Sequence, residues 1–177
     1  ESNAEKNWHA LRERFAHARR VHGVSGIKNA HRQAARLARS EFFFVVDGDN
    51  RVYEDFDFRF EFSPQKDTLY VWRCLNPVNH LVYGYGGVKL YNKHLLLELD
   101  RPASDTSLGA SFDGAIDGAI DIATTVAPKY QPVFVTASTT HFNATPFEAW
   151  RGAFREAAKL TLNIRKNPQD VHSSQRL

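Results

Sequence analysis

Residues 42–49 read Phe-Phe-Phe-Val-Val-Asp-Gly-Asp, and they say more about the architecture of this 177-residue chain than any other stretch. Five consecutive apolar residues, Phe42 to Val46, are typical of a strand buried on both faces of a sheet. Before them, Ile27 to Ala38 carries apolar side chains at helical spacing, and Arg19 to Val24 has the pattern of a short strand. A strand, a helix and a buried strand in this order predict a βαβ unit and a parallel sheet.

Further elements are predicted on both sides of this unit. Ser2-Asn3-Ala4-Glu5 is a capping box and predicts a first helix. The alternation of Phe56, Phe58, Phe60 and Phe62 with polar residues predicts a strand with one solvated face. We also expect strands at Leu69–Cys74, Val88–Tyr91 and Pro132–Thr136, and helices at Asp113–Thr125 and from Thr145 onward. The prediction is one α/β domain over residues 1–162, a mixed sheet flanked by helices, followed by a polar C-terminal tail over residues 163–177.

Composition and charge limit the classes of protein to which the chain can belong. Hydrophobic residues make up 42% and charged residues 24% of it, as in ordinary globular proteins. No apolar run approaches the roughly 18 residues of a membrane span, so no membrane partner is expected. A lone cysteine, Cys74, allows no internal disulfide or zinc cluster and fits a reducing, cytoplasmic location. Residues 1–40 hold nine Lys/Arg against three Glu, which indicates a polyanionic partner or else a solvated, Arg-rich helix face.

Asp47-Gly48-Asp49 directly follows the apolar run, and ligands of α/β sheets bind at the carboxyl ends of strands. Two carboxylates separated by a glycine can hold Mn²⁺ or Mg²⁺, which in turn holds a diphosphate; the alternative is a plain Asp-Gly turn. An EF-hand is excluded, because Arg51 and Val52 stand where Asp or Asn and Gly are required. A haloacid-dehalogenase-like phosphatase would use Asp47 as nucleophile, but the Thr or Ser that usually follows is lacking. An Asp-x-Asp that binds the metal and diphosphate of a nucleotide sugar fits best.

Several segments together make the chain recognisable. The helix His31–Glu41 leads into the Asp-Gly-Asp strand as it does in GT-A type glycosyltransferases. In combination with it, four more segments resemble the TET-associated glycosyltransferases of phages and some eukaryotes: Val21–Ile27, Asn76-Pro77-Val78-Asn79, Tyr83–Leu90 and Phe147–Leu160. The resemblance covers roughly residues 3–160 and implies a GT-A-like fold. Because a nucleotide-binding strand ordinarily precedes the first helix of that fold, we expect this strand to be missing from the chain.

The resemblance implies a metal-dependent enzyme that moves a sugar from a nucleotide sugar, a UDP-sugar, to a hydroxymethylated pyrimidine in DNA. The cofactor would be Mn²⁺ or Mg²⁺, and the setting would be the cytoplasm of an infected host if the chain is of phage origin. The basic stretch over residues 1–40 would then hold the phosphate backbone. Two alternatives stay open: a non-catalytic DNA-binding module of the same fold, and the phosphatase that uses Asp47.

The metal and the donor have candidate residues in three places. Asp49 is the expected direct metal ligand, Asp47 contacts the metal or the ribose, and His141 completes the metal shell unless it is a plain loop histidine. Lys28 and His31, on the helix before the strand, would lie near the nucleoside of the donor. The cations that recur every four residues on the last helix would neutralise the diphosphate or simply face solvent: Arg151, Arg155 and Lys159.

The acceptor and the chemical step have candidate residues in the middle of the chain. A glycine-rich stretch with tyrosines and nearby asparagines would form a substrate wall, the alternative being a plain hairpin: Asn76, Asn79, Tyr83, Tyr85, Gly86 and Gly87. An inverting enzyme needs a carboxylate base, for which Asp121 is the first candidate and Asp117 the second. In a retaining enzyme both acids could be helix-surface residues.

Overall fold

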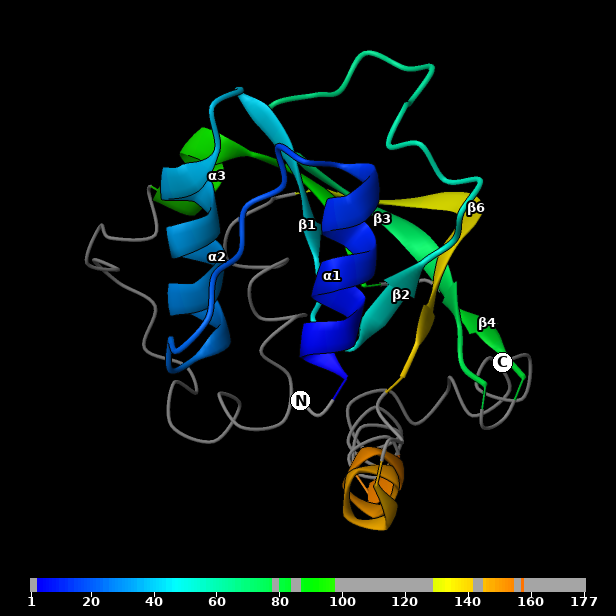
Figure 1. Ribbon diagram of the computed structural model, residues 1–177. Helices are drawn as coiled ribbons and strands as arrows, with labels where there is room; N and C mark the ends of the chain where they lie inside the picture. Colours follow the sequence, from blue (N-terminus) through cyan, green and yellow to red (C-terminus); the bar gives the residue numbers. More distant parts are fainter. Residues whose placement is uncertain are drawn as a thin grey trace, which may run out of the picture.

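The computed structural model describes residues 3–77, 80–83, 87–97, 129–141, 145–154 and 157. Within them the helices are α1 (Ala4–Arg14), α2 (Ile27–Leu37) and α3 (Lys93–Leu97), with one more helical stretch over residues 146–154. The strands are β1 (Phe42–Val46), β2 (Asn50–Val52), β3 (Thr68–Leu75), β4 (Val82–Tyr83), β5 (Val88–Asn92) and β6 (Lys129–Thr140). Figure 1 shows the helices around one twisted sheet. No helix among these residues is long and apolar enough to cross a membrane.

The strands form one mixed sheet in the order β1-β5-β3-β6-β2, with β4 added beside β3. Among the described strand pairs only β3–β6 is parallel, whereas β1–β5, β3–β5, β3–β4 and β2–β6 are antiparallel. The predicted mixed α/β architecture is therefore confirmed at this level. The predicted βαβ unit is wrong, because β1 pairs antiparallel with β5 and residues 19–24 form no strand. A strand needs a neighbour for its backbone groups, and residues 19–24 have none in the described sheet.

Two apolar layers enclose the sheet. On one face Ala35 of α2 and Leu96 of α3 pack against Val71 and Tyr91, with Phe43 and Val45 of β1 alongside. The opposite face carries Tyr70, Trp72, Val88 and Leu90, and Leu11 of α1 contacts it together with Phe42, Phe44 and Val46. Side chains alternate between the faces of a strand, so β1 contributes to both layers. Figure 1 accordingly shows α2 and α1 on either side of β1.

The aromatic segment predicted as a strand over 56–62 is irregular. All four of its phenylalanines turn toward the core on the α1 side, and the rings of Phe56 and Phe58 meet edge to face at 4.9 Å. Phe58 has a φ of +60°, which breaks the extended backbone. The guanidinium of Arg14 donates to the carbonyls of Tyr53, Glu54 and Phe56, so a side chain satisfies groups that a strand would have offered to a neighbour. The alternating pattern therefore predicted correctly that the four phenylalanines face the core. It predicted wrongly that the backbone of this segment pairs as a strand.

Strand β1 lies at the edge of the described sheet, and all five of its residues are half-buried instead of buried on both faces. Asp47 N–H donates to the Gly87 carbonyl at 2.8 Å and Lys93 N–H to the Glu41 carbonyl at 2.7 Å. In this antiparallel ladder the odd-numbered residues of β1 therefore bond to β5. The backbone groups of Phe44 and Val46 point the other way, toward the open edge.

The helix after Thr145 begins where the sequence predicts it. Thr145 Oγ1 accepts a hydrogen bond from the Glu148 N–H at 3.2 Å, a side-chain N-cap. Phe147, Trp150 and Phe154 are each more than 60% exposed, and their rings stack with centroids 6.1 and 5.7 Å apart. The helix expected at 113–125 and the tail expected at 163–177 lie outside the described residues.

Candidate functional site

A cleft of about 1320 Å³ opens along the edge of β1. Its walls are α1, α2 and the segment 15–24 between them, and β1 forms its floor. Asp47, Gly48 and Asp49 line it at the carboxyl end of β1, and Gly152 of the last helix lines it too. The carboxylates predicted to bind a ligand therefore lie at a cavity large enough for a nucleotide-sized molecule.

The Asp47-Gly48-Asp49 turn is held from several sides. Asn50 N–H donates to the Asp47 carbonyl at 3.0 Å, which closes the turn. Asn7, buried on α1, donates through Nδ2 to the Gly48 carbonyl at 2.9 Å. The N-terminal helix is thereby attached to the turn, and neither asparagine was among the residues expected from the sequence.

The Asp49 carboxylate is oriented by a chain of polar contacts. Asn50 Nδ2 donates to Asp49 Oδ1 at 2.7 Å, and Asn50 Oδ1 accepts from Ser138 Oγ at 2.9 Å. Asn50 is 5% exposed and lies directly over Gly87. Burial, with the neighbouring Asp47 carboxylate adding to it, raises the pKa of Asp49 above its usual value.

The Asp47 carboxylate has a different partner. Lys89 Nζ lies 2.5 Å from Asp47 Oδ2, and the side chain of Lys89 is only 6% exposed while that of Asp47 is 32% exposed. Lys89 belongs to β5, where Val45 is its neighbour across the ladder, so its ammonium reaches Asp47 diagonally. The two carboxylates of the motif are thus distinguished, one paired with a buried cation and the other held by an amide.

His141 is brought to the motif by the pairing of β2 with β6. Its backbone N–H donates to the Asp49 carbonyl at 2.6 Å, and its own carbonyl accepts from Asn3 Nδ2 at 3.0 Å. The structure therefore places two of the three predicted metal ligands, Asp49 and His141, side by side along the backbone. The described residues contain no group of three His, Cys, Asp or Glu side chains close enough to hold a metal ion by themselves.

Of the predicted donor-binding residues, His31 lies on the side of α2 that lines the cleft. Its side chain is buried, and its ring centroid is 5.5 Å from that of Tyr91. His31 Nδ1 donates to the Ile27 carbonyl at 2.9 Å, which leaves Nε2 as a buried acceptor without a partner among the described residues. Burial, and to a lesser degree the Lys89 ammonium, lowers the pKa of His31. Lys28 and Arg151 are exposed, on α2 and on the helix 146–154; Arg155 and Lys159 lie outside the described residues.

The predicted acceptor wall is described only in part. Asn76 is 4% exposed at the end of β3, and β4 brings Tyr83 opposite Cys74. Gly87 is buried against Asn50, so it supports the position of that side chain. The other wall residues and both candidate bases lie outside the described residues: Asn79, Tyr85, Gly86, Asp117 and Asp121.

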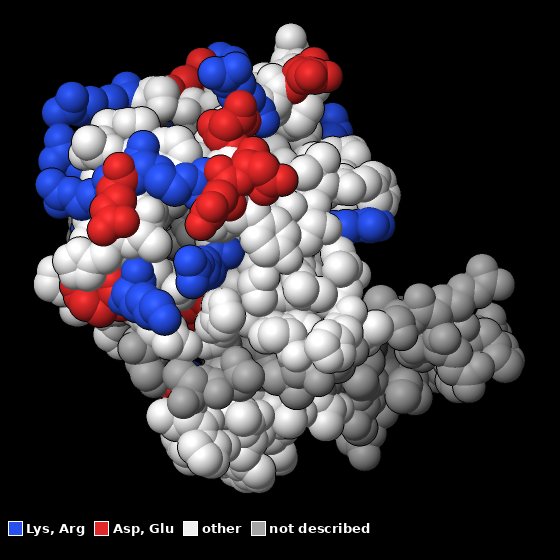
Figure 2. All heavy atoms as spheres, turned by 45° about the vertical axis from the view of Figure 1, so that its right-hand side comes forward, with Lys and Arg blue, Asp and Glu red and all other residues white. Residues whose placement is uncertain are grey.

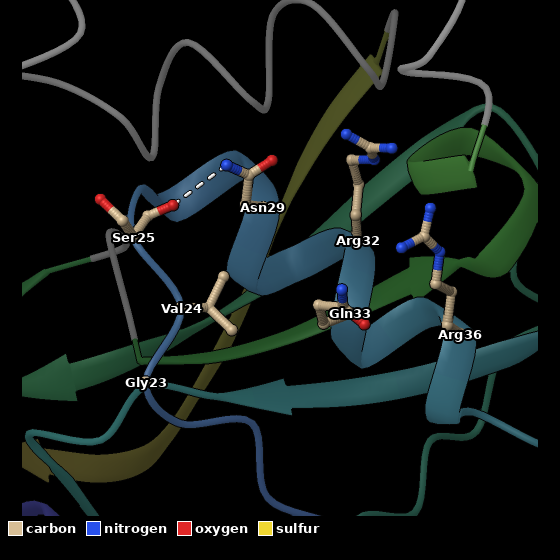
Figure 3. A pocket seen from close by; sticks show the side chains of 7 residues that line it. All are labelled: Gly23, Val24, Ser25, Asn29, Arg32, Gln33 and Arg36. Atoms are coloured by element: carbon tan, nitrogen blue, oxygen red, sulfur yellow. Dashed lines mark hydrogen bonds between the residues drawn. The ribbon is translucent and has the colours of Figure 1, made fainter.

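The face of α2 that turns away from the cleft carries a smaller hollow of about 390 Å³. Figure 3 shows the side chains of Arg32 and Arg36 rising from successive turns of α2 on the same side, with Asn29 hydrogen-bonded back to Ser25. Neither Asp47 nor Asp49 lines this hollow. On the face of the molecule seen in Figure 2, Lys and Arg are interspersed with Asp and Glu.

Lys89, like Asn7 and Asn50, is a residue of this site that sequence reasoning missed. It stands between Val88 and Leu90 in a predicted strand, and a lysine flanked by buried residues in a core strand signals a buried charge that needs a partner. Which carboxylate that partner is depends on the pairing of β1 with β5.

The chain was compared with family models, with curated proteins and with solved structures, and none of them matches.

Proposed function

We propose that the chain is a metal-dependent glycosyltransferase domain that transfers a sugar from a UDP-sugar to a hydroxymethylated pyrimidine in DNA. The observation that supports this most strongly is the Asp47-Gly48-Asp49 turn at one end of a large cleft, with His141 beside Asp49. In this proposal the sugar nucleotide lies in the cleft, with its diphosphate at the turn and its nucleoside toward α2.

The donor set fits a cation that is shared with a diphosphate. Mg²⁺ and similar cations are commonly bound by one or two protein carboxylates, with phosphate oxygens and water filling the remaining positions. Asp49 and His141 would supply the protein ligands, and no complete protein cage is needed. When bound, the cation would neutralise the charge that develops on the leaving diphosphate.

The nucleoside end of the cleft also offers recognition groups. Nε2 of His31 has no hydrogen-bond partner among the described residues, and it would gain a hydrogen bond from an N–H or O–H group of the donor. The acceptor would approach from outside the cleft, since a C5 substituent of a pyrimidine projects into the major groove of DNA.

A binding screen tests the proposal. Thermal unfolding is followed with UDP-sugars, other nucleotide sugars and free nucleotides, each with and without Mn²⁺, because a ligand of the folded state raises its melting temperature. We expect a shift that needs both a UDP-sugar and Mn²⁺, and transfer of the sugar to DNA that contains hydroxymethylcytosine. Asp49→Ala should abolish the shift and the transfer while DNA affinity stays within about twofold, because in this proposal Asp49 binds the metal of the donor and not the DNA.

Two outcomes would overturn the proposal in favour of its alternatives. DNA binding without any nucleotide-dependent shift or sugar consumption would support a non-catalytic DNA-binding module. A phosphoryl-enzyme on Asp47, formed from a phosphate ester without any sugar nucleotide, would support the phosphatase.

A further inference from the structure

Lys89 is a buried cation in contact with Asp47, which lines the cleft. Its side chain is 6% exposed, and its ammonium lies 2.5 Å from Asp47 Oδ2. A buried ammonium is stable only beside an opposite charge, and Asp47 is the carboxylate that the described residues place there. Among the described residues no cation forms an ion pair with Asp49, whose Oδ1 accepts from the neutral amide of Asn50; Lys89 acts on Asp49 only at longer range.

This arrangement sets the net charge of the motif. Two ionised carboxylates would carry a charge of −2, and the Lys89 ammonium reduces it to −1. Attraction of a divalent cation depends on that charge, most strongly where water is largely excluded. The ion pair holds Asp47 Oδ2 to a buried cation, whereas Asp49 Oδ1 accepts only from a neutral amide, so Asp49 is the better candidate for direct metal coordination.

We propose that Lys89 is a positioning residue that withdraws Asp47 from the metal and weakens binding of the free cation, so that metal binds well only together with a diphosphate. This inference rests on the proposed function, because it concerns the metal of that site. A nucleoside diphosphate would restore the negative charge that Lys89 neutralises. Metal and nucleotide would therefore bind cooperatively.

A charge series on the full chain tests the inference. Lys89→Met changes the charge of the motif to −2, Asp47→Asn changes it to 0, and the double variant Asp47→Asn/Lys89→Met returns it to −1. Binding of Mn²⁺ alone is measured by electron paramagnetic resonance, and circular dichroism shows whether each variant is folded. Lys89→Arg serves as the matched control, because it keeps the charge.

We expect Lys89→Met to lower the Kd for Mn²⁺ about tenfold and Asp47→Asn to raise it about tenfold, with the double variant within about threefold of the wild type. Addition of UDP should tighten Mn²⁺ binding to the wild type about tenfold or more, and to Lys89→Met by clearly less. A lysine that only supports the fold would not make metal bind more tightly when it is removed.

The inference is overturned if folded Lys89→Met binds Mn²⁺ no more tightly than the wild type. Should Lys89→Met not fold, the double variant decides: it must bind Mn²⁺ at least about fivefold more tightly than Asp47→Asn, and equal binding refutes the inference. No measurable Mn²⁺ binding in any variant refutes it as well. If the charge series holds but no UDP-sugar binds or reacts, the proposed function fails while the role of Lys89 stands, so the two failures are distinguishable.

Discussion

Gly87 leaves room for the side chain of Asn50, which orients the Asp49 carboxylate. A methyl group at position 87 would overlap the side-chain amide of Asn50. Asn50 is the group that donates to Asp49 Oδ1 and accepts from Ser138, so any side chain at position 87 displaces the residue that orients the acid. The backbone of Gly87 is not in the left-handed region, and space alone requires glycine there.

We therefore expect Gly87→Ala to destabilise the fold by about 1–3 kcal/mol through overpacking. The measurement is denaturant unfolding of a double-mutant cycle with Asn50→Ala, which removes the side chain that the new methyl group meets. In the Asn50→Ala background the cost of Gly87→Ala should fall to about 0.5 kcal/mol or less. An equal cost in both backgrounds would show that the overlap with Asn50 is not the cause.

His31 gives the molecule a pH dependence of definite sign. The pKa of His31 is lowered in the fold, so the unfolded chain takes up a proton more readily than the folded one. The stability that neutral His31 contributes is present in full above pH 6.5, the ordinary pKa of histidine. It declines as the pH falls through 6.5 toward the lower pKa of His31 in the folded protein. Asp49 has a raised pKa and acts in the opposite direction at more acidic pH.

To check this, the free energy of unfolding is measured between about pH 8 and pH 5 for the wild type and for His31→Gln. The wild type should lose stability on acidification, and the difference between the two proteins should shrink as the pH drops, since glutamine does not titrate. If both proteins follow parallel curves, His31 is not the group responsible.

At the scale of elements, local sequence patterns predicted where helices and strands lie better than they predicted which strands pair. The bounds of β1 and the start of the helix at Thr145 match the sequence expectations, because apolar runs and capping residues act over a few neighbouring positions. The partner of β1 could not be predicted, since register with β5 joins residues that are far apart in the chain. For the same reason Lys89 was not assigned to the site. Asp49 and His141 are also far apart in the chain, and they were expected at one site because the resemblance implied it.

The Thr145 cap offers a test confined to one element. Thr145→Ala removes the acceptor for the Glu148 N–H, and loss of a cap costs about 1 kcal/mol of helix stability. Amide hydrogen exchange over residues 149–153 should therefore quicken about fivefold, whereas Thr145→Ser keeps the hydroxyl and should exchange nearly as the wild type does. Equal exchange in Thr145→Ala and the wild type would mean that the cap does not hold this helix.

For the whole molecule, the balance of charges limits how DNA can be held. The net charge is +3, and Figure 2 shows anions among the cations on the face that it displays. The proposed DNA acceptor would thus make few phosphate contacts with the protein, although residues 1–40 are basic in the sequence. Recognition would depend on the modified base more than on the backbone.

Accordingly, the logarithm of DNA affinity should fall with the logarithm of salt concentration with a slope of about −2 to −4, the value for a few neutralised phosphates. Fluorescence anisotropy with a hydroxymethylated duplex gives this slope. The same duplex without the modification is the control, and it should show the same slope at lower affinity, because the phosphates are identical. A steep slope near that of large basic DNA-binding proteins would contradict this picture.

The place of β6 in the sheet also determines when the site is completed during protein synthesis. A chain leaving the ribosome can pair β1, β5 and β3 once Asn92 has emerged, whereas β2 has β6 as its neighbour in the described sheet. The bond between Ser138 and Asn50 joins residues 88 apart, and the Asp49–His141 contact follows it. Loop closure over such distances is slow, so Asp49 emerges early and gains its final surroundings last, whereas Asp47 can pair with Lys89 before β6 is made. A nascent chain that ends before β6 has most of its sheet but no assembled site.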